Sequence, residues 1–239
     1  MLKPLLDRAK EADLVVLPEL ADSGYNFENR EQAFEFSEDP QNSIFVEFLT
    51  GYAAANNITV VTGFNERAGD DLFNSALVIN KDGIAGKYRK IHLFWNEKDI
   101  FMPGDQKPEV YETAGVKFGL LICFDWIFPE LWRFLALQGV DLICHPSNLV
   151  LPGKAQKAVP VQAMMNRIYV ATANRIGTEG NLTFTGNSII ADPDGYVLAS
   201  AAPRSEEILF AIVDTKKSRN KMATPRNHIF NDRRPEFYS

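Results

Sequence analysis

Short apolar runs rich in β-branched residues alternate along the chain with amphipathic segments. Runs of roughly four to eight such residues are typical of buried strands, and amphipathic segments are typical of helices that cover a sheet. We therefore expect strands at residues 14–17, 58–63, 75–80, 115–122, 141–144, 169–173, 187–191, 196–198 and 208–213. Helices are expected near 43–55, 129–137 and 155–167.

Two turn signals indicate how these strands connect. Residues 192–195, Asp-Pro-Asp-Gly, separate two predicted strands, and residues 81–83, Lys-Asp-Gly, follow the predicted strand 75–80 as a hairpin signal. Such turns join antiparallel strands, whereas strands linked through a helix pair in parallel. The pattern thus predicts a layered α/β fold with mixed sheets. No repeat, linker or low-complexity tract interrupts residues 1–239, so we expect a single domain.

Composition and charge narrow the classes of function. The net charge of −6 argues against non-specific nucleic-acid binding, which needs a basic face. No apolar run approaches the roughly 20 residues that span a bilayer. Two cysteines are too few for a secreted disulfide scaffold, which favours a cytoplasmic protein. The histidines form no ligand-spaced motif, so we expect no metal and no cofactor. We interpret Cys144, His92 and His145 as structural residues.

Cys123 is the first residue whose context suggests chemistry. It ends an apolar strand and precedes a predicted helix that begins at Pro129. A cysteine at such a turn can expose its sulfur, and nearby backbone N–H groups can bind a developing oxyanion. These are the requirements of a nucleophile. The alternative is a buried structural thiol, since free cysteine is often buried.

Two charged residues also follow apolar strands or lead into apolar stretches. Glu19 directly follows a buried strand between Leu17 and Leu20, a protected position that suits a general base. The alternative is a solvated loop carboxylate. Lys90 ends a basic run at the start of an apolar stretch, and a fixed ammonium there can stabilise an oxyanion. The alternative is a solvated charge.

Together these residues lie in segments that resemble a known family. The segments are LPEL (17–20), YRKIHL (88–93) and ICFDWIFPE (122–130). In order and spacing they resemble the three signature segments of the nitrilase superfamily of carbon–nitrogen hydrolases. Four supporting segments are SGY (23–25), HPSN (145–148), NRIG (174–177) and NDRRPEFY (231–238). The resemblance covers nearly the whole chain.

The resemblance implies a role for each residue of the predicted site. Cys123 would be the nucleophile and Glu19 the base that takes its proton. Lys90 would stabilise the tetrahedral oxyanion together with the backbone N–H of Phe124. Family members often carry a second glutamate shortly after the lysine. Glu97, seven residues after Lys90, is its expected counterpart and would orient the substrate or assist the lysine; the alternative is a surface charge.

Four further positions are expected to bind substrate. They are Phe124, Tyr25, Trp126 and Asn148. Trp126 would wall the pocket or instead pack beneath the catalytic turn.

The family fold implied is a four-layer αββα sandwich of two mixed sheets flanked by helices, and the family's dimers extend this sandwich. The polar and aromatic C-terminal tail lacks core-like periodicity, and a partner subunit would explain its order. A homodimer or higher homo-oligomer is therefore expected. The chain is short at its N-terminus compared with the family, because about a dozen residues precede the first strand. We expect a longer form to be more soluble and to melt at a higher temperature.

The expected reaction is hydrolysis of a small amide through a cysteine thioester, with release of ammonia. Phe124 and Asp125 after the cysteine resemble the amidase-type branches; nitrilases tend to carry tryptophan and glutamate there. A nitrilase acting on a small aliphatic nitrile and an N-carbamoyl amine or amino acid amidohydrolase are alternatives. A scaffold protein on the same fold is a non-enzymatic alternative. A redox-sensing thiol protein is another, although Cys144 lies on a different predicted strand.

Overall fold

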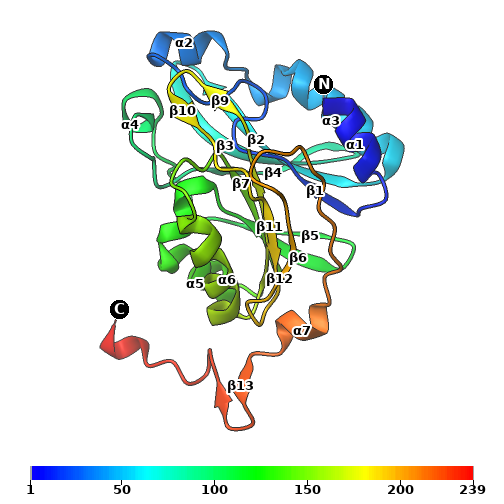
Figure 1. Cartoon of the computed structure of the whole chain (residues 1–239), viewed down its shortest axis with the longest axis vertical. Helices are drawn as coiled ribbons and strands as arrows, with labels where there is room; N and C mark the ends of the chain where they lie inside the picture. Colours follow the sequence, from blue (N-terminus) through cyan, green and yellow to red (C-terminus); the bar gives the residue numbers. More distant parts are fainter. Residues whose placement is uncertain (1, 239) are drawn as a thin grey trace.

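Two mixed β-sheets stack face to face in the computed structural model, which describes residues 2–238 (Figure 1). The first sheet has the strand order β1-β2-β3-β4, and the second has the order β12-β11-β8-β7-β6-β5. The strands of the first sheet are β1 (Leu14–Val16), β2 (Thr59–Ala68), β3 (Asp71–Asn80) and β4 (Gly83–Arg89). Those of the second are β5 (Val110–Thr113), β6 (Val116–Leu120), β7 (Leu142–Ser147), β8 (Tyr169–Asn174), β11 (Ile189–Ala191) and β12 (Val197–Ser200).

Both sheets combine parallel and antiparallel pairs, as the connections predict. β1 and β2 are parallel, and β2, β3 and β4 follow as antiparallel hairpins. In the second sheet β6, β7 and β8 are parallel, with antiparallel strands on either side. Two small hairpins stand apart: β9 (Thr178–Glu179) with β10 (Leu182–Thr183), and β13 (Met222–Thr224) with β14 (Asn227–His228).

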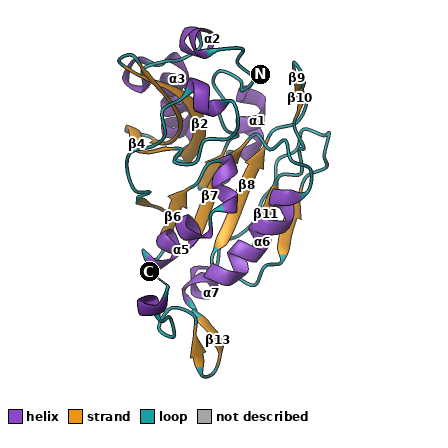
Figure 2. Ribbon diagram, turned by 90° about the vertical axis from the view of Figure 1, so that its left-hand side faces the viewer, coloured by secondary structure: helices purple, strands orange, loops and turns teal. Residues whose placement is uncertain are grey.

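Helices cover the outer face of each sheet (Figures 1 and 2). The helices of the chain are α1 (Leu2–Ala9), α2 (Arg30–Glu35), α3 (Ile44–Asn56), α4 (Glu97–Ile100), α5 (Pro129–Leu137), α6 (Lys154–Asn166) and α7 (Thr215–Arg219). Short 3-10 helices are η1 (Pro40–Asn42), η2 (Cys123–Ile127) and η3 (Pro235–Phe237). α1 and α3 cover the first sheet, and α5 and α6 cover the second, which gives the expected αββα order.

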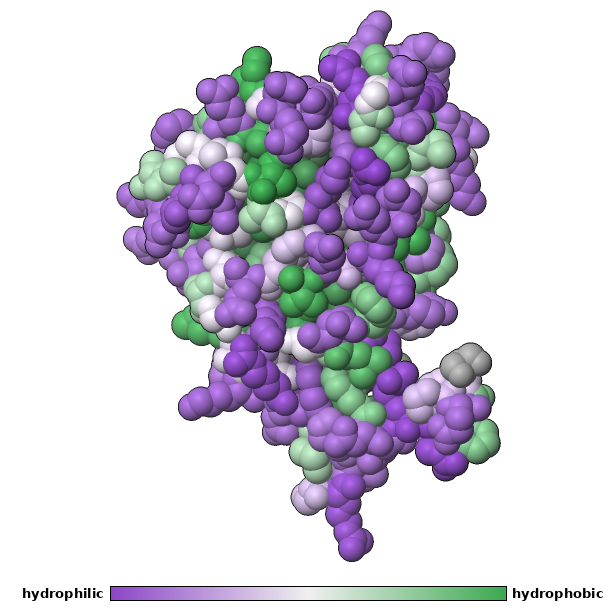
Figure 3. Space-filling model, turned by 180° about the vertical axis from the view of Figure 1, so that it is seen from behind, coloured by the Kyte–Doolittle hydropathy of each residue, from purple (hydrophilic) through white to green (hydrophobic). Residues whose placement is uncertain are grey.

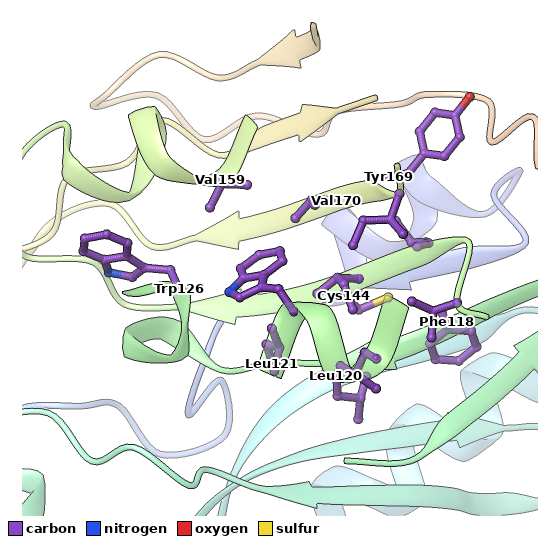
Figure 4. Close-up of a cluster of buried hydrophobic side chains, with 14 of the residues drawn as sticks. Phe118, Leu120, Leu121, Trp126, Cys144, Val159, Tyr169 and Val170 are labelled. Carbon is purple, nitrogen blue, oxygen red and sulfur yellow. The ribbon is translucent and has the colours of Figure 1, made fainter. Parts of the chain in front are cut away.

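Apolar side chains fill the spaces between these layers. Leu49 and Tyr52 of α3 pack against Val60 and Leu77 on the outer face of the first sheet. A larger cluster joins the inner faces of the two sheets and continues under α5 and α6 (Figure 4). Burial of this apolar surface is the main force that holds the four layers together.

The predicted helices have local reasons to begin and end where they do. The Ser43 hydroxyl accepts a hydrogen bond from the Val46 N–H at 3.1 Å and caps α3. Asn57 ends that helix in the left-handed conformation, with φ 54°. α5 begins at Pro129, a residue that fits the first helical turn because it lacks an N–H.

The strand expected at 208–213 is wrong. These residues form no strand in the described chain, and Ile212 and Phe210 are 90% and 54% exposed. An apolar β-branched run becomes a strand only when a neighbouring backbone supplies hydrogen-bond partners. No strand of residues 2–238 pairs with this run.

Strand ends from both sheets meet at one edge of the sandwich. Glu19 follows β1, Lys90 follows β4, Cys123 follows β6, and Asn148 follows β7. Residues far apart in the sequence are thus brought together there. Among residues 2–238, no helix has the length and apolar character that a membrane crossing requires.

Candidate active site

Cys123 occupies a constrained and buried turn. It begins η2 directly after the buried residues that end β6, and its φ of 41° is in the left-handed region. The side chain is only 4% exposed, so the expectation of an exposed sulfur is wrong. Burial raises the pKa of the thiol well above its usual value; Glu19 and Glu97 raise it further, and Lys90 opposes them. The resting thiol therefore carries its proton and needs a base to lose it.

Glu19 has one carboxylate oxygen held and one free. Oε1 accepts hydrogen bonds from Lys90 Nζ at 2.6 Å and from Asn74 Nδ2 at 2.8 Å. Oε2 is buried and has no hydrogen-bond partner within residues 2–238. The Asn148 side chain donates to the Glu19 carbonyl at 2.8 Å and so fixes the backbone. An unpartnered carboxylate oxygen at a buried position can accept a proton.

Lys90 joins Glu19 to Glu97. Its Nζ lies 2.8 Å from Glu97 Oε1, and the lysine side chain is fully buried. Burial disfavours the charged ammonium, but the two carboxylates outweigh it and raise the pKa of Lys90 above its usual value. Two of the three ammonium protons point at carboxylates, which leaves one for another acceptor.

Glu97 is a buried member of this cluster, at 4% exposed, and not a surface charge. Oε1 also accepts the Tyr25 hydroxyl at 2.7 Å, and Oε2 accepts the Phe94 N–H at 3.0 Å. Burial and Glu19 raise the pKa of Glu97, while Lys90 lowers it. Tyr25 and Phe94 therefore fix the orientation of this carboxylate against the lysine.

The expected substrate-binding residues lie in different environments. The backbone N–H of Asn148 lowers the pKa of the Cys123 thiol, against the larger opposite effect of burial. Phe124 is partly exposed, and its ring lies 5.1 Å from Phe94 between centroids. Trp126 packs in the core near Val159 of α6, at 9% exposed (Figure 4). Of its two predicted positions, packing beneath the turn describes Trp126 best.

Sequence reasoning missed residues that support the site from behind. Asn74 holds Glu19 and is itself fully buried in β3. Its signal was a polar amide within an apolar strand. Asp125 accepts the Ile122 N–H and the Tyr88 hydroxyl, both at 2.9 Å, and contacts His92 Nδ1 at 2.9 Å. Its signal was a carboxylate two residues after the cysteine.

Cys123 does not line either of two surface hollows formed by the described residues. Hollows of about 840 Å³ and 490 Å³ are lined by other residues, including Arg67 and Phe134 respectively. Cys123, Lys90, Glu19 and Glu97 are each at least nine-tenths buried. The site is therefore closed around the sulfur. Within residues 2–238, no group of three or more His, Cys, Asp or Glu side chains is arranged to hold a metal ion.

Comparison with known proteins identifies the family. Residues 5–221 match the family described as Carbon-nitrogen hydrolase. The chain belongs to the carbon–nitrogen hydrolases. A protein named nitrilase from Pyrococcus abyssi is 47% identical over 227 residues, which cover 95% of this chain and 86% of that protein. This hydrolase is therefore an enzyme of the nitrilase superfamily, as its signature segments predict.

Solved structures support the same assignment. The crystal structure of Saccharomyces cerevisiae Nit3, a member of branch 10 of the nitrilase superfamily, matches with a TM-score of 0.82 and 30% identity. The match covers 90% of this chain and 83% of that chain. An amidase from Nesterenkonia sp. AN1, solved with the acetamide moiety of fluoroacetamide added covalently at its active site cysteine, matches with a TM-score of 0.71 and 27% identity. That match covers 84% of this hydrolase and 80% of the amidase. The likeness to both confirms the αββα fold.

Proposed function

We propose that this enzyme hydrolyses a small amide through a thioester on Cys123 and releases ammonia. The observation that carries the proposal is that the two carboxylate oxygens of Glu19 differ in their hydrogen bonds. Its Oε1 is held by Lys90 and Asn74, and its buried Oε2 has no partner in the described chain. A free oxygen of a fixed carboxylate, close enough to raise the pKa of a protonated thiol, is the arrangement a general base needs.

In the first step Glu19 takes the thiol proton as the sulfur attacks the amide carbon. The carbon–sulfur bond forms, and the carbonyl oxygen becomes an oxyanion. The unpaired third proton of the Lys90 ammonium and the Phe124 N–H are the proposed donors to it. Donors fixed before the reaction are effective because they need no reorganisation as the charge develops.

In the second step the protonated Glu19 gives its proton to the amide nitrogen. The carbon–nitrogen bond breaks and ammonia leaves, so that a thioester remains on Cys123. Water then attacks this thioester while Glu19 takes one of its protons. Collapse of the second tetrahedral intermediate releases the free acid and expels the thiolate of Cys123. The thiolate then regains its proton from Glu19.

The closed site favours a small acyl group. Each of the four charged or nucleophilic residues is buried, and aromatic side chains of Phe94 and Phe124 lie beside the turn. The Nesterenkonia amidase carries the acetamide moiety of fluoroacetamide covalently at its active site cysteine, which supports a nucleophilic cysteine beside a space that holds a small amide. A small aliphatic nitrile is the second candidate substrate, because the relative from Pyrococcus abyssi is named a nitrilase.

A substrate panel tests the proposal. We expect ammonia release from small aliphatic amides to exceed release from nitriles and ureido acids of the same size. Cys123→Ala and Glu19→Gln should each lower kcat by about 10⁴-fold or more, as removal of a nucleophile or its base does elsewhere. Cys144→Ala is the matched control, since Cys144 is a buried thiol on β7. Turnover that survives Cys123→Ala would refute the mechanism.

We also propose that two copies pair through the α5 and α6 layer. Exposed apolar side chains occur on or beside these helices. These side chains are Ile127, Leu137, Leu151, Val161, Met164 and Met165. The C-terminal segment stands apart from the body of the molecule (Figure 3). Phe237 and Tyr238 of the tail are 72% and 61% exposed. Burial of such side chains against a second copy would be favourable.

A further inference from the structure

His145 contacts the backbone of the nucleophile. It is fully buried in β7, the strand parallel to β6. Its Nε2 lies 2.9 Å from the Cys123 carbonyl oxygen, and its Nδ1 lies 3.0 Å from the Thr172 hydroxyl on β8. The catalytic sequence proposed above does not use this side chain.

The partners of the ring decide where its proton lies. A carbonyl oxygen only accepts hydrogen bonds, so Nε2 must carry the proton it donates to Cys123. Burial lowers the pKa of His145 and favours the neutral ring. Nδ1 therefore accepts from the Thr172 hydroxyl, and the ring is held as a single tautomer.

The same contact fixes the direction of the next N–H. No peptide bond within residues 2–238 is cis. In a trans peptide the carbonyl and the N–H point in opposite directions. Because the Cys123 carbonyl faces His145, the Phe124 N–H faces away from β7. That N–H has no hydrogen-bond acceptor among the described residues.

The backbone at Cys123 needs such support. Its φ of 41° lies in the left-handed region, which is unfavourable for a residue with a side chain. Asp125 holds the Ile122 N–H just before it, and His145 holds the carbonyl just after it. Without the second contact, the Cys123–Phe124 peptide can rotate, while the Ile122 N–H before Cys123 stays bonded to Asp125.

We propose that His145 is a positioning residue that aims the Phe124 N–H at the substrate oxyanion by holding the Cys123 carbonyl. The inference rests on the proposed function. It predicts a defect in transition-state stabilisation, with the nucleophile itself left reactive. Substrate binding in the ground state should change little, because the oxyanion exists only in the transition state and the intermediate.

The test compares His145→Phe, which keeps a buried aromatic ring without the donor, with His145→Gln, whose amide can replace the Nε2 proton. We expect His145→Phe to lower kcat by about 10²-fold, as loss of an oxyanion donor does, with KM within about threefold. We expect His145→Gln to recover most of that loss. If His145→Phe fails to fold, His145→Leu gives the same comparison. Cys144→Ala on the same strand is the control.

The second readout is alkylation of Cys123 by iodoacetamide, a displacement that forms no oxyanion. Its rate should stay within about threefold in His145→Phe, while kcat falls about 10²-fold. Equal loss of both rates would mean that His145 only maintains the nucleophile or the fold, and would overturn the proposal. Unchanged kcat in His145→Phe would also overturn it. Failure of the proposed function is distinct, because the wild-type enzyme would then turn over no amide or nitrile.

Discussion

Lys90 balances the charge of the buried cluster. It is the shared partner of Glu19 and Glu97, at 2.6 and 2.8 Å, and all three side chains are almost completely buried. Removing one member of a buried ion pair leaves an uncompensated charge and typically costs about 3–5 kcal/mol. The role of the lysine in stability is therefore separable from its proposed role toward the oxyanion.

We expect Lys90→Met to abolish turnover and to lower the free energy of unfolding by about 3–5 kcal/mol in urea denaturation. The double variant Lys90→Met with Glu97→Gln removes one unpaired carboxylate. It should regain part of the stability and none of the activity. If Lys90→Met is as stable as the wild type, Lys90 does not balance the charges of Glu19 and Glu97.

Asp22 gives the folded state a pH-dependent contribution. Burial, with Glu38 nearby, raises its pKa to about 7, although hydrogen bonds from the Asn65 N–H oppose the shift. The folded protein therefore binds a proton that the unfolded chain releases near pH 4. Between these values the stabilisation falls as the pH rises, and it is absent above about pH 7.

Asp22→Asn should remove this dependence, because asparagine stays neutral and still accepts a hydrogen bond. We expect the wild-type protein to lose roughly 5–10 °C of melting temperature relative to Asp22→Asn between pH 5 and pH 8, because about two pH units of linkage lie in that interval. Differential scanning calorimetry at both pH values measures the difference. An equal change in melting temperature for the two proteins between pH 5 and pH 8 would show that Asp22 does not titrate in this range.

At the scale of elements, β2 lies so close to the turn after β1 that no side chain fits between them at Gly63. A Cβ added at Gly63 would lie 2.3 Å from the Leu20 nitrogen and 2.4 Å from the Glu19 Cα. The Gly63 N–H also donates to the Pro18 carbonyl at 3.0 Å. The glycine thereby allows β2 to hold the segment that carries Glu19.

Gly63→Ala should displace the Glu19 backbone, lower kcat by at least about tenfold and reduce the melting temperature, since a shift of about 1 Å at a catalytic group can cost 10²-fold. Gly51→Ala in α3 is the matched control, because nothing lies within 4 Å of its added Cβ. That variant should keep full activity and gain roughly 0.5–1 kcal/mol of stability. Normal kinetics for Gly63→Ala would show that the turn tolerates displacement.

At the scale of the whole molecule, exposed apolar residues occur on both outer helical layers, but only the α5 and α6 layer belongs to the proposed pairing surface. Val161 on α6 is 47% exposed, within the proposed pairing surface. Ile44 on α3 is 78% exposed but lies on the opposite outer layer. A lysine at the centre of a pairing surface would bury an unpaired charge, which opposes association.

We expect Val161→Lys to shift the enzyme from dimer to monomer in light scattering coupled to size-exclusion chromatography. Ile44→Lys should leave the dimer intact. The C-terminal tail is part of the proposed contact with the second copy. Deletion of residues 222–238 should therefore weaken the dimer as well. A wild-type protein that is monomeric at micromolar concentration would contradict the proposed pairing.

The sequence by itself determined the elements with strong local signals. α5 spans the predicted residues 129–137, and α3 and α6 differ from their predicted ranges by one residue at each end. Caps, turns and hydrophobic periodicity act over a few residues, so they can be read directly. The family segments likewise indicated Glu19, Lys90 and Cys123 as a set, and the resemblance added Glu97 as the second glutamate after the lysine.

The tertiary structure decided what depends on distant partners. The run at 208–213 has strand composition but no paired neighbour, so it forms no strand. The sulfur of Cys123 is buried because both sheets and their connecting turns close over it. The contacts of Asn74 with Glu19, of Asp125 with Tyr88 and of His145 with Cys123 form only when segments separated by many residues meet in space. Hydrogen bonds and burial depend on distances in space, and a linear pattern does not contain those distances.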